Sequence, residues 1–157
     1  MIHDIDHLVG RAMRLGVWIN IVAPAILATI AYLLFDSGTI QPNADMAEGQ
    51  TVLFFALVGV AISELVVAFV MRRILFSPER AKPIRHDPAL VELWVVRSSI
   101  VIFALGASPM AYGVILFFLS GDLRHLALFG IVCLLAYRLF RPTKDLLEAA
   151  LQDVVPQ

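Results

Sequence analysis

The sequence predicts an all-α polytopic membrane protein with four transmembrane helices. Of its 157 residues, 60% are hydrophobic and only 16% are charged, whereas soluble domains are about half apolar and about a quarter charged. Its mean hydropathy is +0.85. Four apolar runs have the length of about 20 residues, or nearly so, that crosses a bilayer as a helix; they are 15–35, 51–71, 93–119 and 123–140. We therefore expect an N-terminal segment 1–14, a transmembrane domain 15–140 and a cytoplasmic tail 141–157.

The N-terminal segment is typical of a short amphipathic helix that lies in the membrane interface and leads into the first span. Apolar side chains fall on one face and polar ones on the other: Ile2, Ile5, Val9 and Ala12 against Asp4, His7, Arg11 and Arg14. Asp4 and Asp6 precede the basic residues, which argues against a cleaved signal peptide. His3 and His7 have a spacing that can bind a metal, but we favour a solvated polar face and expect no metal.

The first span, 15–35, contains no charged side chain but two residues that interrupt an apolar helix. Asn20 lies near its start and is expected to hydrogen-bond to a neighbouring helix. Pro24 is expected to kink the helix, because proline has no backbone N–H and leaves one carbonyl without its donor.

The second span, 51–71, carries one carboxylate, Glu64, and leads directly into Arg72 and Arg73. A charged side chain at the centre of a membrane helix costs about 3 kcal/mol on insertion scales, so such residues commonly face other helices and have a partner or a function. Glu64 is therefore the first candidate functional residue.

The third and fourth spans also carry features that single them out. The third, 93–119, has Arg97 near its cytoplasmic end and Pro109, which is expected to produce a second kink. The fourth, 123–140, is the shortest and has Arg138 near its end. After it, the pattern of segment 144–155 predicts a short amphipathic helix that docks on the membrane, on the basic loop 72–92 or on a partner.

Basic residues lie almost entirely on one side of the predicted spans. Ten lie on that side, namely Arg11, Arg14, Arg72, Arg73, Arg80, Lys82, Arg85, Arg138, Arg141 and Lys144, and one, Arg124, lies on the other. Basic loops remain cytoplasmic. The sequence therefore predicts that both termini are cytoplasmic in a bacterial inner membrane.

An internal repeat is a further hypothesis. Segments 14–38 and 97–121 have the same length, both end in Ser-Gly, and each contains a proline. They indicate either a duplication that produced two parallel hairpin repeats or a chance likeness between apolar helices.

Helix depths, at about 1.5 Å per residue, suggest one polar layer in the cytoplasmic third of the membrane. Its members are Glu64, Arg97, Asn20, Ser63, Ser98, Ser99 and Arg138. We expect Glu64 to pair with Arg97, because a guanidinium can hold a carboxylate through two hydrogen bonds. Such a pair keeps the carboxylate ionised and indicates a structural role; the alternative is an ion or proton pathway.

The second and third spans together resemble the hairpin of the rotary ATPase c subunit. Gly59, Ala61 and Ser63 are similar to the alternating small residues of that family's first helix, and Met110-Ala111-Tyr112-Gly113 is similar to a pattern in its second helix. The resemblance implies close packing through Gly59, Ala61, Tyr112 and Gly113, and assembly into rings. It departs at Ala107, where the family has its ion-carrying carboxylate, so no carrier residue is implied. The chain also resembles four-span bacterial membrane proteins that end in an Arg-Pro-Thr-Lys sequence, here 141–144.

The sequence contains no H-E-x-x-H, G-x-S-x-G, P-loop or dinucleotide-binding motif, and its one cysteine, Cys133, lies in an apolar run. We expect no enzyme activity, no cofactor and no nucleic-acid partner. The first hypothesis is a structural or accessory subunit that forms a homo-oligomer or joins a larger complex in the lipid bilayer. The alternatives are a c-like or channel-like ion or proton translocator using Glu64, and a small-molecule carrier with a cavity between its kinked helices.

Overall fold

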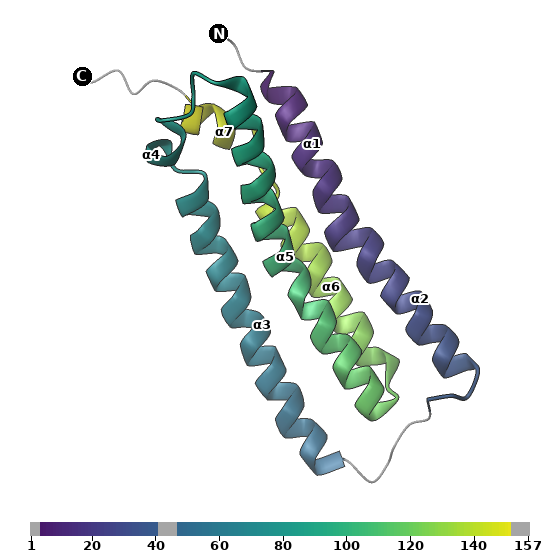
Figure 1. Cartoon of the computed structure of the whole chain (residues 1–157). Coiled ribbons are helices and arrows are strands. Elements are labelled where there is room, and N and C mark those ends of the chain that lie inside the picture. The colour runs from purple at the N-terminus through teal and green to yellow at the C-terminus, as the bar shows by residue number, and fades with distance from the viewer. Residues whose placement is uncertain (1–3, 41–46, 152–157) are drawn as a thin grey trace.

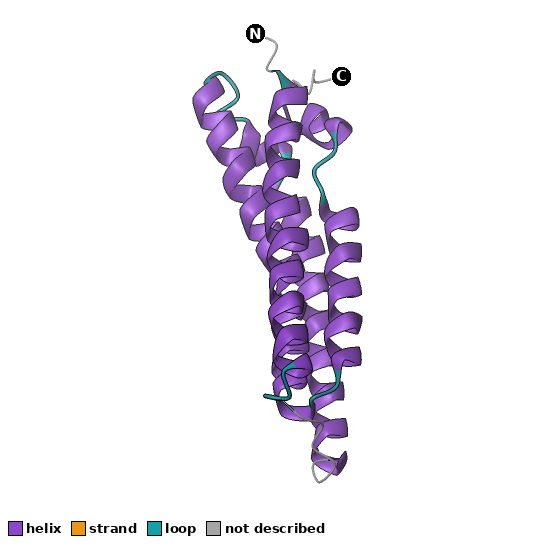
Figure 2. Cartoon of the chain, turned by 90° about the vertical axis from the view of Figure 1, so that its right-hand side faces the viewer, coloured by secondary structure: helices purple, strands orange, loops and turns teal. Residues whose placement is uncertain are grey.

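The structure is a computed structural model that describes residues 4–40 and 47–151, and within these ranges the chain forms helices and no β-strand (Figure 2). Four helical segments are long and apolar enough to cross a membrane: Ile5–Asp36, Gly49–Leu75, Pro88–Ser120 and Leu123–Phe140. The prediction of an all-α polytopic membrane protein is therefore confirmed.

The four spans form an elongated antiparallel bundle (Figure 1). The elements are α1 (Ile5–Val17), the π-helix η1 (Trp18–Val22), α2 (Ala23–Asp36), α3 (Ala47–Leu75), α4 (Pro78–Ala81), α5 (Pro88–Ser120), α6 (Leu123–Phe140) and α7 (Lys144–Leu151). α1, η1 and α2 form one rod on one side, α3 lies on the opposite side, and α5 and α6 lie between them. The start of α1 lies at the same end of the bundle as α4 and α7.

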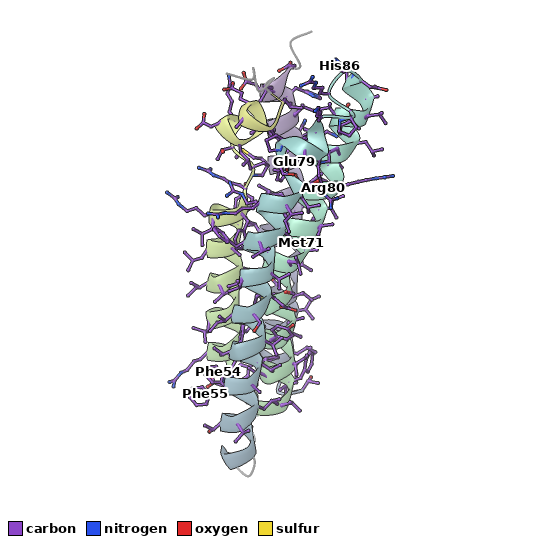
Figure 3. All side chains as sticks on the ribbon, turned by 90° about the vertical axis from the view of Figure 1, so that its left-hand side faces the viewer. Phe54, Phe55, Met71, Glu79, Arg80 and His86 are labelled. Carbon is purple, nitrogen blue, oxygen red and sulfur yellow. The ribbon has the colours of Figure 1, made fainter. Side chains whose placement is uncertain are left out.

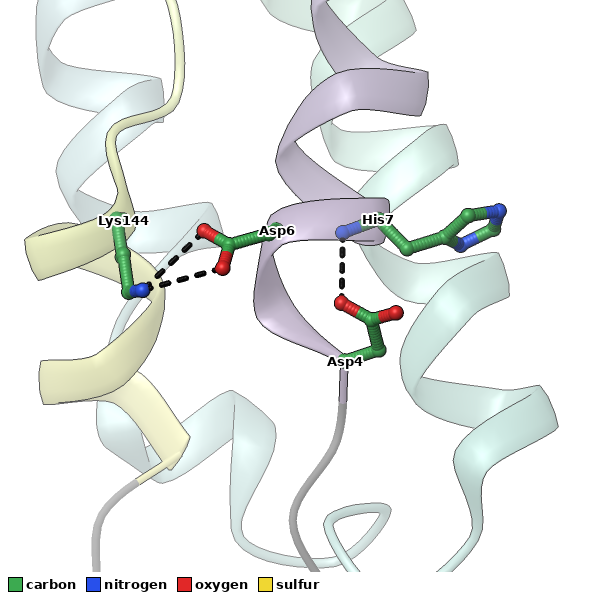
Figure 4. Close-up of polar contacts among 4 residues, drawn as sticks. All are labelled: Asp4, Asp6, His7 and Lys144. Carbon is green, nitrogen blue, oxygen red and sulfur yellow. Dashed lines mark hydrogen bonds and ion pairs between the residues drawn. The ribbon is translucent and has the colours of Figure 1, made fainter.

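The N-terminal segment is helical, as predicted, and it runs directly into the first span instead of forming a separate helix. α1 begins at the cap residue Asp4, whose carboxylate accepts the His7 backbone N–H at 3.0 Å (Figure 4). Leu8 and Ala12 are buried in the core that α1 forms with α5 and α7, so α1 continues the line of the first span. The predicted His3–His7 metal pair lies partly outside the described residues.

The interruption of the first span takes the form of a π-helix. The N–H of Ala23 donates to the carbonyl of Trp18, five residues back, in the turn that precedes Pro24. A π-bulge is one of the ways in which a helix accommodates a residue that cannot complete the i to i−4 ladder. Asn20 lies in this turn and is fully buried.

Asn20 does not make the interhelical hydrogen bond that its position suggested. Its amide Nδ2 donates within its own rod, to the carbonyl of Gly16 at 3.5 Å. Its Oδ1 has no hydrogen-bond donor among the described residues and faces Gly106 on α5, 3.2 Å from the position that a Cβ would occupy there. Asn20 therefore marks a close approach between the first span and α5.

α5 is the central helix of the bundle. Buried residues occur along its whole length, from Val91 to Ser120. It packs most extensively on α6, where a Cβ added at Gly113 would come within 2.9 Å of the Phe129 Cβ. The two helices are joined by a tight turn in which Gly121 adopts a left-handed φ of 66°.

α3 is the most exposed of the four spans. Only 11% of its membrane window is buried, against 44% for α5, so its remaining surface is available to lipid or to another chain. Its C-terminal end is fixed to α5, because the indole N–H of Trp94 donates to the carbonyl of Leu75 at 3.0 Å. The Phe76 and Trp94 rings also meet edge to face, with centroids 5.5 Å apart. These contacts set the register of the α3–α5 pair.

Among the described residues, two ion pairs join the elements that meet at the α7 end of the bundle. Lys144 at the start of α7 lies 3.2 Å from the Asp6 carboxylate on α1 (Figure 4). The hydrogen bond to Asp6 raises the pKa of Lys144 above its usual value. Arg11 pairs with Glu92 on α5. α7 is thus held to α1 by a charge pair in addition to its buried residue Leu147.

Candidate functional site

Glu64 lies on α3 and faces two hydroxyl groups on α5. The Oγ of Ser108 lies 2.5 Å from Glu64 Oε2, and the Oη of Tyr112 lies 2.6 Å from Glu64 Oε1. Ser108 and Tyr112 are four residues apart, which places them on one face of the helix. All three side chains are half-buried, because they meet where α3 and α5 touch at the edge of the bundle. The site is thus built from one carboxyl and two neutral hydroxyls.

The predicted pairing of Glu64 with Arg97 is wrong. No ion pair connects these two residues within the described part of the chain. Arg97 lies eleven residues before Ser108 on α5, a separation of about 16 Å along a helix. The contact between Trp94 and Leu75 explains the difference, since in antiparallel helices it places Arg97 level with the end of α3 and Glu64 level with the second half of α5. The expected depths of Glu64 and Arg97 were counted from the basic residues that flank each span. α5 begins earlier, at Pro88, so Arg97 lies about two and a half turns into the helix and not at the depth of Glu64.

Pro109 makes Ser108 part of the backbone structure as well as part of the site. Proline has no N–H, so the carbonyl of Leu105, four residues earlier, has no i+4 amide donor. The Ser108 Oγ lies 2.8 Å from that carbonyl oxygen. Ser108 can therefore replace the missing amide donor, which lets α5 pass through Pro109 without a break.

The hydrogen atoms available at the site limit how these contacts can be made. A serine hydroxyl has one hydrogen and two acceptor positions. If Ser108 donates to the Leu105 carbonyl, its 2.5 Å contact with Glu64 Oε2 needs a hydrogen from the carboxyl itself. This distance is within the range of O–H···O hydrogen bonds. The Tyr112 hydroxyl donates to Glu64 Oε1, and the single hydrogen of Ser108 is shared between Glu64 Oε2 and the Leu105 carbonyl.

An ionised Glu64 requires a different arrangement. The Ser108 hydroxyl then has to turn to the carboxylate, which leaves the Leu105 carbonyl without the donor that Pro109 cannot supply. No cationic side chain forms an ion pair with Glu64 among the described residues, and an uncompensated charge in a low-dielectric region is costly. Glu64 thus lies beside two hydroxyl groups, and no cation pairs with it among the described residues.

The other members of the predicted polar layer do not join this site. The Ser63 hydroxyl is exposed and donates to the Gly59 carbonyl of its own helix at 2.9 Å. Ser98 and Ser99 are buried on α5, and the Ser99 hydroxyl has no hydrogen-bond partner among the described residues. Arg138 is exposed on α6. Asn20 lies against Gly106 on α5, and Arg97 lines a separate pocket near the end of α3. The single polar layer is therefore not formed.

The residues of the c-like packing motif serve different contacts. Ala61 is buried in a cluster with Leu116 and Phe129 at the contact of α3 with the α5–α6 pair. Gly113 faces α6, and a Cβ added at Gly59 would meet nothing within 4 Å. Tyr112 supplies a hydroxyl to Glu64. Ala61, Tyr112 and Gly113 therefore lie at contacts between helices, whereas Gly59 faces open space.

Sequence reasoning missed Ser108 as a site residue and assigned Tyr112 to packing. The signal that could have found them is the Ser-Pro step itself, because a serine before a helical proline is well placed to supply the missing donor. A tyrosine one turn later on the same face is the second part of that signal.

Comparison of the chain with known protein families, with curated proteins and with solved structures found no match. The resemblance to the c subunit therefore stays a prediction.

Proposed function

We propose that this protein is a non-catalytic, proton-translocating membrane subunit in which Glu64 carries the proton. The observation that supports the proposal is the position of the Ser108 Oγ, within hydrogen-bonding distance of both Glu64 and the Leu105 carbonyl. This geometry accommodates a proton on Glu64 and provides two hydroxyls that stabilise the carboxylate after the proton has left. The absence of an arginine partner among the described residues removes the reason for treating Glu64 as permanently ionised.

The position of the site supports exchange with a neighbouring chain. Glu64 is half-buried on the least covered span, and the adjacent residues Ser63 and Ala111 are exposed. A second copy or a partner subunit that packs on this edge would complete the surroundings of the carboxyl. We therefore propose an assembly in a bacterial inner membrane, with both termini cytoplasmic, in agreement with the distribution of basic residues.

Proton flux into liposomes that contain the purified protein tests this proposal. A membrane potential drives the flux, and a pH-sensitive dye inside the liposomes reports it. We expect flux above that of empty liposomes, and its loss in Glu64→Gln, which keeps the shape of the side chain but cannot release a proton. Ser63→Ala is the matched control, because that hydroxyl lies next to Glu64 but bonds to its own helix. Wild-type liposomes that behave like empty ones, or flux that persists in Glu64→Gln, would contradict the proposal.

A purely structural subunit is the second candidate, and the exposure of α3 favours it. Gly59 and Ser63 are four residues apart and exposed, and this spacing of small residues permits close approach of another helix. In this case Glu64 fixes α3 on α5 and transports nothing. Glu64→Gln would then leave ion flux unaffected, and Gly59→Leu would lower the oligomeric mass of the detergent-extracted particle.

A further inference from the structure

A pocket of about 540 Å³ opens where the end of α3 meets α4 and the first turns of α5. Its volume is within the range of about 300–1,000 Å³ that is typical of small-molecule sites. The lining is apolar except for two arginines and one serine; the residues important here are Leu75, Arg80, Leu93, Trp94, Arg97 and Val101. In Figure 3, Arg80 lies at the opposite end of the bundle from Phe54 and Phe55.

The pocket is positively charged. Neither guanidinium, of Arg80 or of Arg97, forms an ion pair or a hydrogen bond within the described parts of the chain. The carboxylates closest in sequence to Arg97 are engaged elsewhere, since Glu92 pairs with Arg11 and Asp87 accepts the N–H groups at the start of α5. No acidic residue lines the pocket. Two guanidiniums without a partner among the described residues, above an apolar wall, can therefore bind an anionic ligand.

The apolar wall indicates which kind of anion fits. Leu93, Arg97 and Val101 succeed one another at four-residue intervals on α5, so the charge of Arg97 is flanked by exposed hydrocarbon along one helix face. The Trp94 side chain is held in place by its hydrogen bond to Leu75. A free inorganic anion would use only the guanidiniums, whereas a phospholipid would place its phosphate on them and an acyl chain along Leu93 and Val101. The positive-inside distribution puts this end in the cytoplasmic leaflet, where anionic lipids attract basic residues.

We infer that this pocket binds an anionic phospholipid, with its phosphate held by Arg80 and Arg97 and its acyl chain packed on the apolar face of α5. The site does not depend on the role of Glu64, which lies on another part of α3. Arginine suits this task because its planar guanidinium donates two parallel hydrogen bonds to a phosphate.

Native mass spectrometry of the full-length protein with added phosphatidylglycerol tests the inference. We expect the wild type to retain phosphatidylglycerol in preference to phosphatidylcholine. Arg80→Gln and Arg97→Gln should each lower its affinity about fivefold, since one basic residue near an anionic lipid contributes about that factor. Arg14→Gln is the control, because it removes an exposed arginine of α1 that does not line the pocket.

Three outcomes would overturn the inference. The first is equal retention of phosphatidylglycerol and phosphatidylcholine by the wild type. The second is an affinity in Arg80→Gln and Arg97→Gln equal to that in Arg14→Gln. The third is displacement of the lipid by inorganic phosphate, which would identify a free-anion site. Both arginines are outside the buried core, so the single variants should fold, and circular dichroism checks that they do.

Discussion

Ser108 contacts two groups that differ in what they require from it. The Leu105 carbonyl needs a donor because of Pro109, and the Glu64 carboxyl can be either donor or acceptor, depending on its proton. The single hydroxyl hydrogen of Ser108 can point at only one of these two groups at a time. The contact of Ser108 with Glu64 is thereby linked to the hydrogen bonding of α5 at its one internal proline, Pro109.

Tyr112→Phe tests the contribution of the second hydroxyl. Loss of the 2.6 Å hydrogen bond to Glu64 should lower the free energy of unfolding in mixed micelles by about 0.5–1.5 kcal/mol. Tyr32→Phe is the control, because the Tyr32 side chain is 55% exposed on α2, and it should have no measurable effect. In a double-mutant cycle with Glu64→Gln, the effects of the two changes should be non-additive. Additive effects would show that the hydroxyl and the carboxyl do not interact.

Two glycines of the spans, Gly59 and Gly113, differ in how closely a neighbouring helix approaches them. Gly113 lies against α6, where an added Cβ would come within 2.9 Å of the Phe129 Cβ, whereas Gly59 on α3 faces open space. The two prolines differ in the same way, since Pro24 follows a π-helix and Pro109 lies within an α-helix beside a serine that supplies a donor. The helix thus accommodates Pro24 by a π-turn and Pro109 by a serine hydroxyl near the free carbonyl.

Substitution of the two glycines by alanine separates these environments. Gly113→Ala should destabilise the protein by about 1–3 kcal/mol, because the methyl group overlaps a neighbouring backbone and side chain that cannot move away freely. Gly59→Ala should be neutral or slightly stabilising, as alanine favours the helix more than glycine does. Unfolding of both variants in mixed micelles measures the difference. Equal effects would contradict the packing of α5 on α6.

The sequence was sufficient to predict the helices but not their register. Apolar length identified all four spans, and Pro24 and Asn20 were recognised as points of interruption. The partner of Glu64 could not be predicted, because it depends on the contact between Trp94 and Leu75. A shift of a few residues between two long antiparallel helices changes which side chains meet. The same shift explains why Arg97 lines a pocket at the end of α3 rather than the carboxyl site.

At the scale of the whole molecule, polar contacts are distributed unevenly along the bundle. The ion pairs of the described residues, Arg11 with Glu92 and Lys144 with Asp6, lie where α1, α5 and α7 meet. The Glu64 site is the point at which a carboxyl lies between spans without a cation. One end of the protein is thus held by charge pairs, and the outer span is held in place by hydrogen bonds that involve hydroxyl and indole groups of α5.

The contact of Lys144 with Asp6 predicts a pH dependence at that end. The pKa of Lys144 is raised in the folded protein, so the charged lysine contributes stability below its unfolded pKa and loses that contribution as the pH rises through the higher folded value. The difference in melting temperature between the wild type and Lys144→Gln should therefore disappear in alkaline solution. It should also shrink at high salt, since both side chains are exposed. A difference that does not vary with pH would show that the ion pair does not contribute.

Infrared spectroscopy of the protein in lipid bilayers at neutral pH tests the protonation of Glu64 most directly. A protonated carboxyl has a carbonyl stretching band separate from those of carboxylates, and it shifts on exchange into D₂O. We predict one such band that is absent in Glu64→Gln, displaced in Ser108→Ala and unchanged in Ser63→Ala. A spectrum in which the wild type and Glu64→Gln differ only in their carboxylate bands would contradict a neutral Glu64.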